Sequence, residues 1–238
     1  MINLVIKKQD ELFKDIAQVY QEQLKVKANS ILGLATGSSP IGLYEELIKL
    51  YNKQEISFKE VITFNLDEYC NLAQTDKNSY FSFMQENLFT KVDINTQNTN
   101  FPPTDEAKIS EYETKLQENI IDIQLLGIGS NGHIAFNEPG SNFNSTVRIV
   151  DLDEKTIQDN ARFFTSVEEV PTQAASMGLA DIMRAKKIIL IAIGENKAEV
   201  LKEIFANDEI TNKIPATLLK NHPDVTFYVD EVAGKYLK

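Results

Sequence analysis

The side chains best suited to proton transfer in this chain are acids, because acids are numerous and histidines are few. The 238 residues include 35 Asp and Glu but only two His and one Cys. Asp67 and Glu68 stand side by side just after the apolar run 61–65. A carboxylate held at the end of a buried strand is partly desolvated and can act as a general base. The alternative is a solvated turn whose acids cap a helix.

A second candidate for proton transfer lies in the glycine-rich segment 127–142. Its histidine, His133, follows Asn131 and precedes Glu138. A histidine oriented by a carboxylate is a proton shuttle, and the alternative is a structural histidine that holds a loop. The segment matches the G-x-G-x-x-G pattern of dinucleotide-binding proteins, but it runs into Pro139 and other helix breakers instead of opening a helix. We therefore expect its glycines to allow some other close approach of the backbone.

A loop of small polar residues could bind an anion. The run 31–35 is followed by a helical pattern, and between them stand Thr36, Gly37, Ser38 and Ser39. Hydroxyl groups, a glycine turn and the free N–H groups of a helix start together make a phosphate site. The alternative is ordinary capping of the helix by one of the two serines. No Gly-Lys-Ser/Thr ending follows, so this is not a nucleotide P-loop.

Two cations stand at similar positions. Lys197 follows the apolar run 188–193, and Arg162 lies in the segment 160–164. In an acidic chain both are candidate phosphate ligands, and the alternatives are a solvated helix-start lysine and a surface arginine. We interpret the remaining histidine, His222, as structural and Cys70 as a small buried residue.

The elements that must position these residues alternate between strands and helices. Short aliphatic runs predict strands over residues 3–6, 31–35, 60–65, 121–127, 147–152, 187–193 and 225–229. Helical spacing predicts helices over residues 40–51, 78–89, 105–119, 171–184 and 196–207. The segment 93–105, rich in Asn, Thr and Pro, predicts a long surface loop.

This alternation predicts an α/β fold in which residues 1–238 form a single domain. The expected architecture is a Rossmann-like, three-layer sandwich around a mainly parallel sheet. In such sheets ligands bind beyond the carboxyl ends of the strands, which is where the candidate residues stand.

The composition excludes several classes of protein. The net charge of −11 disfavours binding to nucleic acid or to anionic lipid. A single cysteine cannot form an internal disulfide, which indicates a reducing compartment, and it excludes a cysteine-rich zinc site. The longest apolar run, 188–193, is far shorter than the ~20 residues of a membrane-spanning helix, and the N-terminus lacks the pattern of a signal peptide. We expect a cytoplasmic protein.

Considered together, these segments resemble the glucosamine-6-phosphate deaminase family. The resemblance rests mainly on LATGSSP at 34–40, VITFNLDEY at 61–69 and GIGSNGHIAFNEP at 127–139. Shorter matching segments stand at 57–59, 79–84, 162–164 and 214–217, so the resemblance runs nearly end to end. Related sugar-phosphate isomerases and lactonases share the style of the first loop.

The resemblance implies conversion of glucosamine 6-phosphate to fructose 6-phosphate and ammonia in amino-sugar catabolism, by a hydrolase without metal or organic cofactor. Asp67 would be the base that moves a proton between carbons 1 and 2. His133 would open the pyranose ring, oriented by Glu138 and Asn131. The residues expected to hold the phosphate are Thr36, Gly37, Ser38, Ser39, Arg162 and Lys197.

This chain departs from the family pattern at two places. Many members have Asp where Asn131 stands, and an amide stabilises a protonated histidine less than a carboxylate does. Members activated by N-acetylglucosamine 6-phosphate carry a longer C-terminus and an Arg-x-Lys-Thr segment, which here is RIVD at 148–151. We therefore expect no allosteric activation and a monomer, or at most a weak oligomer. We expect the moving lid to follow the strand 147–152 and to extend through Phe164.

Three other functions compete with this interpretation. A lactonase or an isomerase acting on another sugar phosphate would share the phosphate loop, but would not require Asp67 and Glu138 together. A sugar-phosphate-sensing module of a regulator would carry a basic DNA-binding segment and lack these acids. A nicotinamide-linked dehydrogenase would use the glycine motif to bind its cofactor.

Overall fold

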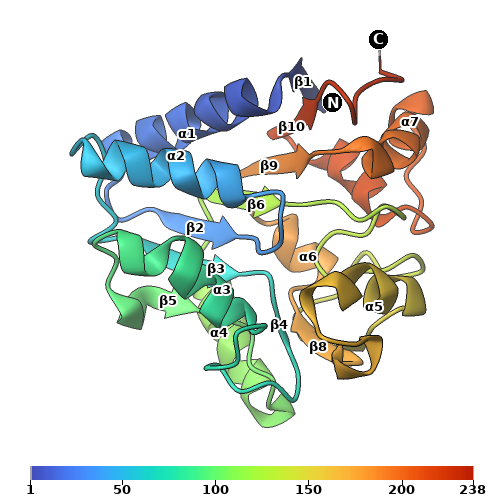
Figure 1. Ribbon diagram of the computed structural model, residues 1–238, viewed down its shortest axis with the longest axis horizontal. Helices are drawn as coiled ribbons and strands as arrows, with labels where there is room; N and C mark the ends of the chain where they lie inside the picture. Colours follow the sequence, from blue (N-terminus) through green and yellow to red (C-terminus); the bar gives the residue numbers. More distant parts are fainter. Residues whose placement is uncertain (1, 238) are drawn as a thin grey trace.

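Seven parallel strands form the central sheet of the computed structural model, which describes residues 2–237 (Figure 1). Their order across the sheet is β1-β10-β9-β6-β2-β3-β5. The strands are β1 (Asn3–Lys7), β2 (Ile31–Leu34), β3 (Ile62–Asn65), β5 (Thr99–Asn100), β6 (Ile123–Leu126), β9 (Lys187–Ala192) and β10 (Val225–Asp230). The central strands are buried on both faces, which explains their nearly continuous apolar sequences. The predicted parallel sheet is confirmed.

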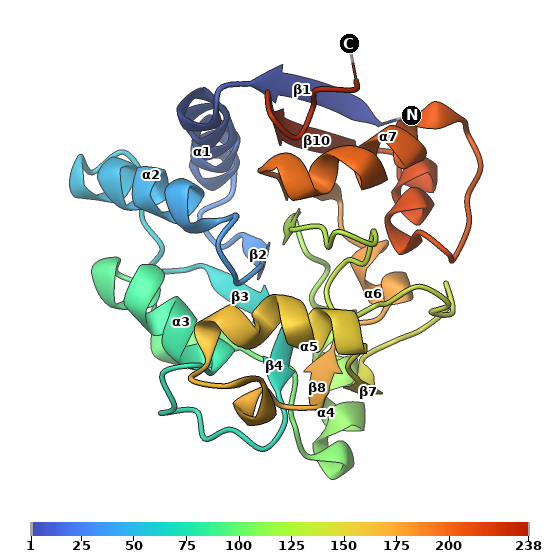
Figure 2. The ribbon, with the colours of Figure 1, turned by 45° about the vertical axis from the view of Figure 1, so that its right-hand side comes forward.

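Helices cover both faces of this sheet and complete three layers. The α-helices are α1 (Gln9–Val26), α2 (Ile41–Asn52), α3 (Tyr80–Asn87), α4 (Ile109–Glu118), α5 (Glu154–Asn160), α6 (Leu179–Ile182) and α7 (Ala198–Ala206). Short 3₁₀ turns are η1 (Phe89–Lys91), η2 (Thr96–Asn98), η3 (Glu106–Lys108), η4 (Ala161–Phe163), η5 (Val167–Glu169), η6 (Glu195–Lys197) and η7 (Pro215–Asn221). Figure 2 shows α1, α2 and α3 on one side of the sheet and α6 and α7 on the other.

Aromatic contacts fix the helices to one face of the sheet. The strand register places Phe64 of β3 and Phe227 of β10 on the same face. Tyr112 of α4 packs edge-on to Phe64, and Phe205 of α7 packs edge-on to Phe227, with ring centroids 6.0 and 5.6 Å apart. Such buried edge-to-face pairs stabilise the layer beyond the free energy of area burial alone.

A second, antiparallel sheet stands beyond the end of β3. It consists of β4 (Asp67–Tyr69), β8 (Gln173–Ser176) and β7 (Arg148–Asp151), in the order β4-β8-β7. The predicted strand over 147–152 is therefore present, but it belongs to this small sheet. Asp67 itself lies in strand β4, so the alternative that placed it in a solvated turn is wrong.

The prediction of a single helix over residues 171–184 is wrong. Its first half is strand β8, which pairs on both sides with β4 and β7, and only Leu179–Ile182 is helical. Gly178 lies between the two parts and is the N-cap of α6. The position requires glycine, because a Cβ there would lie 2.0 Å from the carbonyl oxygen of Ser145. Pairing with distant strands thus overrides the local helical pattern.

The other predicted elements agree closely with the structure, but helices α1 and α5 were not predicted. The helices expected over 105–119 and 196–207 each consist of a 3₁₀ turn that leads into an α-helix. The loop expected over 93–105 contains the short edge strand β5, which pairs with β3. Within residues 2–237, the chain forms no helix that is both long and apolar enough to cross a membrane.

Candidate active site

Four neighbouring strands of the sheet, β9, β6, β2 and β3, carry the four segments that the sequence analysis singled out. All four strands are parallel, so the segments that follow them emerge at the same edge of the sheet. The chain moves from β2 toward β3 on one side, whereas β6 leads toward β9 on the other. Such a topological switch point opens a crevice in which ligands bind.

A cavity of about 300 Å³ occupies this crevice. It is lined by Thr36, Gly37, Ser38, Ser39, Asp67, His133, Arg162 and Lys197, together with residues that the sequence analysis did not predict. The volume is at the lower end of the range for small-molecule sites. Among the predicted site residues, Asn131 and Glu138 do not line the cavity; they lie behind His133 and contact it.

The loop after β2 leaves its polar groups available to a ligand. Gly37 has a φ angle of +91°, in the left-handed region that only glycine adopts freely. The N-cap of α2 is Pro40, and no side chain caps this helix. The alternative of capping by Ser38 or Ser39 is therefore wrong. Free N–H groups at the start of α2 and the loop hydroxyls can instead receive an anion.

The two neighbouring acids have separate roles. Asp67 is only 8% exposed and faces the cavity. Burial, together with the negative charge of Glu68, raises the pKa of Asp67 to about 8. A carboxyl group with such a pKa retains a proton more readily than an ordinary aspartate, and once ionised it is a stronger base.

Glu68 points away from the cavity and holds the start of α3. Its carboxylate accepts hydrogen bonds from the backbone N–H groups of Tyr69, Tyr80 and Phe81, each at 2.9 Å. Burial raises the pKa of Glu68, and these three bonds oppose the rise. Helix capping, which belonged to the alternative interpretation, is thus found for Glu68 and not for Asp67.

His133 lies against a carboxylate, as predicted. Its Nδ1 atom is 3.2 Å from Oε2 of Glu138. Asn131 connects to both residues, because its side-chain nitrogen donates to Oε2 of Glu138 at 2.8 Å and its oxygen accepts from the backbone N–H of His133 at 3.1 Å. Burial would raise the pKa of Glu138, but His133, Thr156 and Asn131 together lower it. Because its pKa is lowered, Glu138 carries a negative charge at neutral pH, and a charged carboxylate at this distance can orient the imidazole.

The glycines of this loop do not bind a dinucleotide phosphate at a helix start. Residues 127–147 contain no helix, so the feature on which the dinucleotide pattern depends is absent from this part of the described chain. A Cβ on Gly129 would lie 2.3 Å from the ring of His133. Gly132 has a φ angle of +85°. The glycines thus allow the backbone to approach the imidazole and to turn sharply, as expected.

The two candidate cations reach the cavity from different elements. Lys197 ends the 3₁₀ turn η6, and Arg162 lies in η4 directly after α5. Burial lowers the pKa of Lys197, the charges of Arg162 and Lys155 lower it further, and Asp159 opposes the change. Positive groups gathered in this way favour an anion, since a bound phosphate would offset their mutual repulsion.

Several lining residues were missed by the sequence analysis. They are Tyr80 at the start of α3, Ala135 and Phe136 in the loop after β6, and Thr156, Asp159, Asn160 and Phe163 on α5 and η4. Tyr80, Ala135, Phe136 and Phe163 lie in segments that resemble the family, but no role was predicted for them. Thr156, Asp159 and Asn160 stand in no such segment, and they reach the cavity through the packing of α5. The helix α5 lies where the lid was expected, across β4 and β8 (Figure 2).

His222 and Cys70 are structural, as the sequence analysis expected. The ring of His222 is 1% exposed; Nε2 lies 2.8 Å from the carbonyl oxygen of Ala185, and Nδ1 accepts from the backbone N–H of Asp224. Cys70 is 5% exposed, and burial raises the pKa of its thiol, so it is a poor nucleophile.

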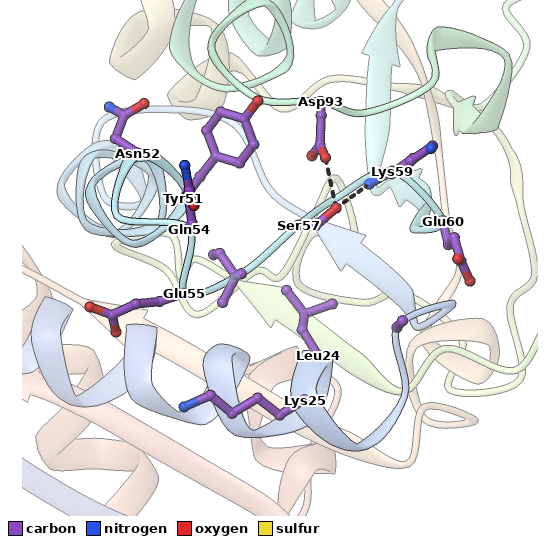
Figure 3. Close-up of a pocket in the computed structure, with 12 residues that line it drawn as sticks. Leu24, Lys25, Tyr51, Asn52, Gln54, Glu55, Ser57, Lys59, Glu60 and Asp93 are labelled. Carbon is purple, nitrogen blue, oxygen red and sulfur yellow. Dashed lines mark hydrogen bonds between the residues drawn. The ribbon is translucent and has the colours of Figure 1, made fainter.

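A larger cavity, of about 660 Å³, lies elsewhere and contains none of the predicted site residues (Figure 3). It lies between the end of α1, the end of α2 and the segment that leads into β3. Its lining mixes lysines with acids, and Ser57 donates to Asp93 at 2.7 Å beside it. The smaller cavity is therefore the candidate active site, because it contains the predicted proton-transfer and phosphate-binding residues.

Comparison with known proteins agrees with the geometry. The family described as glucosamine-6-phosphate isomerases/6-phosphogluconolactonase matches residues 7–228. The chain belongs to this family. It is 48% identical over 236 residues to the glucosamine-6-phosphate deaminase of Mycoplasma mycoides subsp. mycoides SC, covering 98% of this chain and 96% of that protein. It is 46% identical over 233 residues to the glucosamine-6-phosphate deaminase of Thermoanaerobacter pseudethanolicus, covering 96% and 92%.

Solved structures of this family have the same fold. A monomeric glucosamine-6-phosphate deaminase superposes with a TM-score of 0.95 at 37% identity, covering 99% of this chain and 100% of the other. The 6-phosphogluconolactonase of Leishmania guyanensis superposes with a TM-score of 0.77 at 20% identity, covering 100% and 99%. The second similarity concerns the fold alone.

Proposed function

We propose that this chain converts glucosamine 6-phosphate and water to fructose 6-phosphate and ammonia. The observation that supports this function best is one cavity that combines Asp67 and the His133–Glu138 pair with an anion-binding loop. An amino sugar phosphate needs all three: a proton shuttle for its ring, a base for its carbon acid and a site for its phosphate. The curated relatives described above carry the name of this activity.

The first step is opening of the pyranose ring. His133 takes the proton of the hydroxyl on carbon 1 and passes it to the ring oxygen as the bond between this oxygen and carbon 1 breaks, which leaves an aldehyde at carbon 1. Glu138, ionised and 3.2 Å from the imidazole, stabilises the charged form of the ring, and Asn131 holds the carboxylate in place. One positioned acid–base group of this kind is worth ~10²–10⁴ in rate.

The second step moves a proton between two carbons. Asp67 removes the proton from carbon 2, while a proton of the substrate's own ammonium group passes to the oxygen on carbon 1, which gives an enolamine. The protonated Asp67 then returns its proton to carbon 1 as the double bond moves to the bond between carbon 2 and nitrogen. The product is an imine at carbon 2. Water then adds to this carbon, ammonia leaves, and the ketone of fructose 6-phosphate remains. The net reaction consumes water, while its path is an aldose–ketose isomerisation.

Binding of the phosphate supplies orientation. The proposed ligands are Thr36, Gly37, Ser38, Ser39, Arg162 and Lys197. They hold the phosphate away from the reacting carbons, so their binding energy fixes the sugar without entering the bond changes. Local recognition of this kind overcomes the net charge of −11, because charges farther than ~8 Å are screened at physiological salt.

The remaining properties follow from the same proposal. Residues 1–238 act as one sugar-phosphate isomerase/deaminase domain that uses no metal or organic cofactor. The protein works as a monomer in the cytoplasm, without nucleic acid or membrane partners. A solved relative that covers the whole chain is described as monomeric, and this supports the proposed oligomeric state.

An ammonia assay tests the proposed function. The purified chain is mixed with glucosamine 6-phosphate, and ammonia and fructose 6-phosphate are both measured. The expected result is equal amounts of the two products. A parallel reaction with 6-phosphogluconolactone covers the lactonase alternative; lactone hydrolysis without ammonia release would overturn the proposal. Titration with nicotinamide cofactors, for which no binding is expected, covers the dehydrogenase alternative.

A further inference from the structure

Glu138 uses its two carboxylate oxygens for different partners. Oε2 lies beside Nδ1 of His133 and accepts from the side chain of Asn131. Oε1 accepts from the hydroxyl of Thr156, which is its one side-chain partner within residues 2–237. A carboxylate that is free to rotate about its terminal torsion would turn its plane away from the imidazole, because the preferences of this torsion are broad. The bond from Thr156 removes that freedom.

Thr156 is unusual for a threonine in a helix. In a helix the threonine hydroxyl commonly donates to a backbone carbonyl one turn earlier. Here it reaches across to a residue in the loop after β6, and the side chain is 3% exposed. It also lines the cavity. A buried hydroxyl directed at an acid that already contacts His133 has a place in the chemistry of the site.

Helix α5 is fixed at a second point one turn further on. The side-chain nitrogen of Asn160 donates to the hydroxyl of Tyr69 at 2.8 Å. Tyr69 lies in β4, the same strand as Asp67. Arg162 follows directly in η4. Helix α5 therefore contacts both Glu138 and strand β4, which carries Asp67. It also leads directly into η4, which carries the proposed phosphate ligand Arg162.

We propose that Thr156 is a positioning residue for the Glu138–His133 pair. By holding one carboxylate oxygen of Glu138, it fixes the plane of the carboxylate and keeps the other oxygen against the imidazole. The position of α5 therefore determines whether Glu138 can orient His133 for proton transfer. A phosphate held by Arg162 stabilises this placement. The inference deepens the proposed function and rests on it for its kinetic consequence, but the geometric claim concerns Glu138 and His133 alone.

Hydroxyl-deletion variants test the proposal. Thr156→Val keeps the shape and removes the hydroxyl, Thr156→Ala removes it with less bulk, and Thr156→Ser retains it. We expect the first two to lower kcat about tenfold or more with little change in KM, because orientation of an acid–base group acts on the reaction step. Thr156→Ser should keep most of the activity. As a matched control, Thr114→Val in α4, whose hydroxyl donates to Ser110 in its own helix, should leave kcat unchanged.

Nuclear magnetic resonance supplies a readout independent of activity. The chain has two histidines, so the ring nitrogens give two sets of ¹⁵N signals, and buried His222 is an internal reference. Removal of the Thr156 hydroxyl should move the Nδ1 signal of His133, leave the signals of His222 in place, and be reversed in Thr156→Ser. Unchanged His133 signals in both Thr156→Val and Thr156→Ala would overturn the proposal.

The two proposals fail in different ways. If the parent chain releases no ammonia from glucosamine 6-phosphate, the proposed function is wrong, and the ¹⁵N signals still decide the role of Thr156. If the parent is active but Thr156→Val and Thr156→Ala retain its kcat, the positioning role is wrong and the function stands. An equal loss of kcat in Thr156→Ser and Thr156→Val would also contradict it, since packing would then be the cause.

Discussion

The imidazole of His133 fills the space in which any residue other than glycine at position 129 would place its Cβ. An ideal Cβ on Gly129 would lie 2.3 Å from Cε1 of this ring. The backbones of the two residues are also joined, because the N–H of Gly129 donates to the carbonyl of His133 at 2.9 Å. Gly129, part of a glycine pattern typical of dinucleotide-binding proteins, thus makes room for the imidazole of His133, a candidate catalytic residue.

Gly129→Ala is expected to displace the imidazole. We expect a loss of ~100-fold in kcat with the fold retained, because a shift of about 1 Å in a reacting group can cost that much. Gly140→Ala is the control, since Gly140 lies in the same loop outside the cavity and no atom lies within 4 Å of the Cβ it would add. Its φ angle of +95° makes it a control for strain in the loop backbone. The measurement is ammonia release by both variants, with far-ultraviolet circular dichroism to verify the fold. Equal activity of the two variants would contradict the assigned role of the glycine.

The activity is expected to depend on ionisation of Asp67. Its pKa of about 8 predicts that kcat/KM rises with pH and levels off above this value, because the base must lose its proton to act. Asp67→Asn should abolish isomerisation while substrate binding is retained. The measurements are a pH–rate profile from pH ~6 to 9 and calorimetric titration of the variant. A profile that is flat through pH 8, or near-normal turnover by Asp67→Asn, would remove Asp67 from the role of base.

Asp67 is also expected to cost stability. Its pKa is raised from 3.8 to about 8 in the folded chain. Below the lower value both the folded and the unfolded chain bind the proton, so Asp67 costs no stability. As the pH rises toward the upper value, the unfolded chain releases the proton first and the free energy of unfolding falls. Asp67→Asn should therefore raise Tm at neutral pH by about 2–4 °C, as expected for ~1 kcal/mol in a protein of this size. Calorimetry between pH ~4 and 8 should show the difference growing with pH. A difference independent of pH would show that the gain has another cause.

The cations are expected to act in binding. Arg162→Ala and Lys197→Ala should each raise KM ~10- to 100-fold, since a hydrogen bond to a charged group is worth about 1.5–3 kcal/mol. Inhibition by inorganic phosphate should weaken in parallel. Lys53→Ala, which removes an exposed charge at the far end of α2 without touching the cavity, is the control. A fall in kcat at unchanged KM in the two cavity variants would show that they act in the chemical step instead.

Kinetics are expected to be hyperbolic and independent of N-acetylglucosamine 6-phosphate. Arg148, at the place of the family's effector segment, donates to Asn137 at 3.1 Å and to the carbonyl of Thr146 at 3.3 Å. Rate curves with and without the acetylated compound, and sedimentation at assay concentration, check both points. A sigmoidal curve abolished by this compound would contradict the expectation.

The sequence by itself predicted the parallel sheet and most of the residues that line or adjoin the cavity. Buried parallel strands are nearly continuous apolar runs, and ligands bind beyond their carboxyl ends, so local patterns located the strands and the segments that follow four of them. His133, its acid Glu138 and the loop from Thr36 to Ser39 were found in this way. These features depend on short stretches of chain, within which composition and spacing hold the information.

Only the tertiary structure determined which way adjacent side chains point and which distant residues come into contact. Asp67 and Glu68 are adjacent and chemically alike, yet one faces the cavity and the other caps α3, because side chains alternate between the two faces of strand β4. Strand β8 was mistaken for a helix, since its partners β4 and β7 are far away in sequence. The contact between Thr156 and Glu138 arises only when α5 packs over the loop after β6, and no local pattern encodes it.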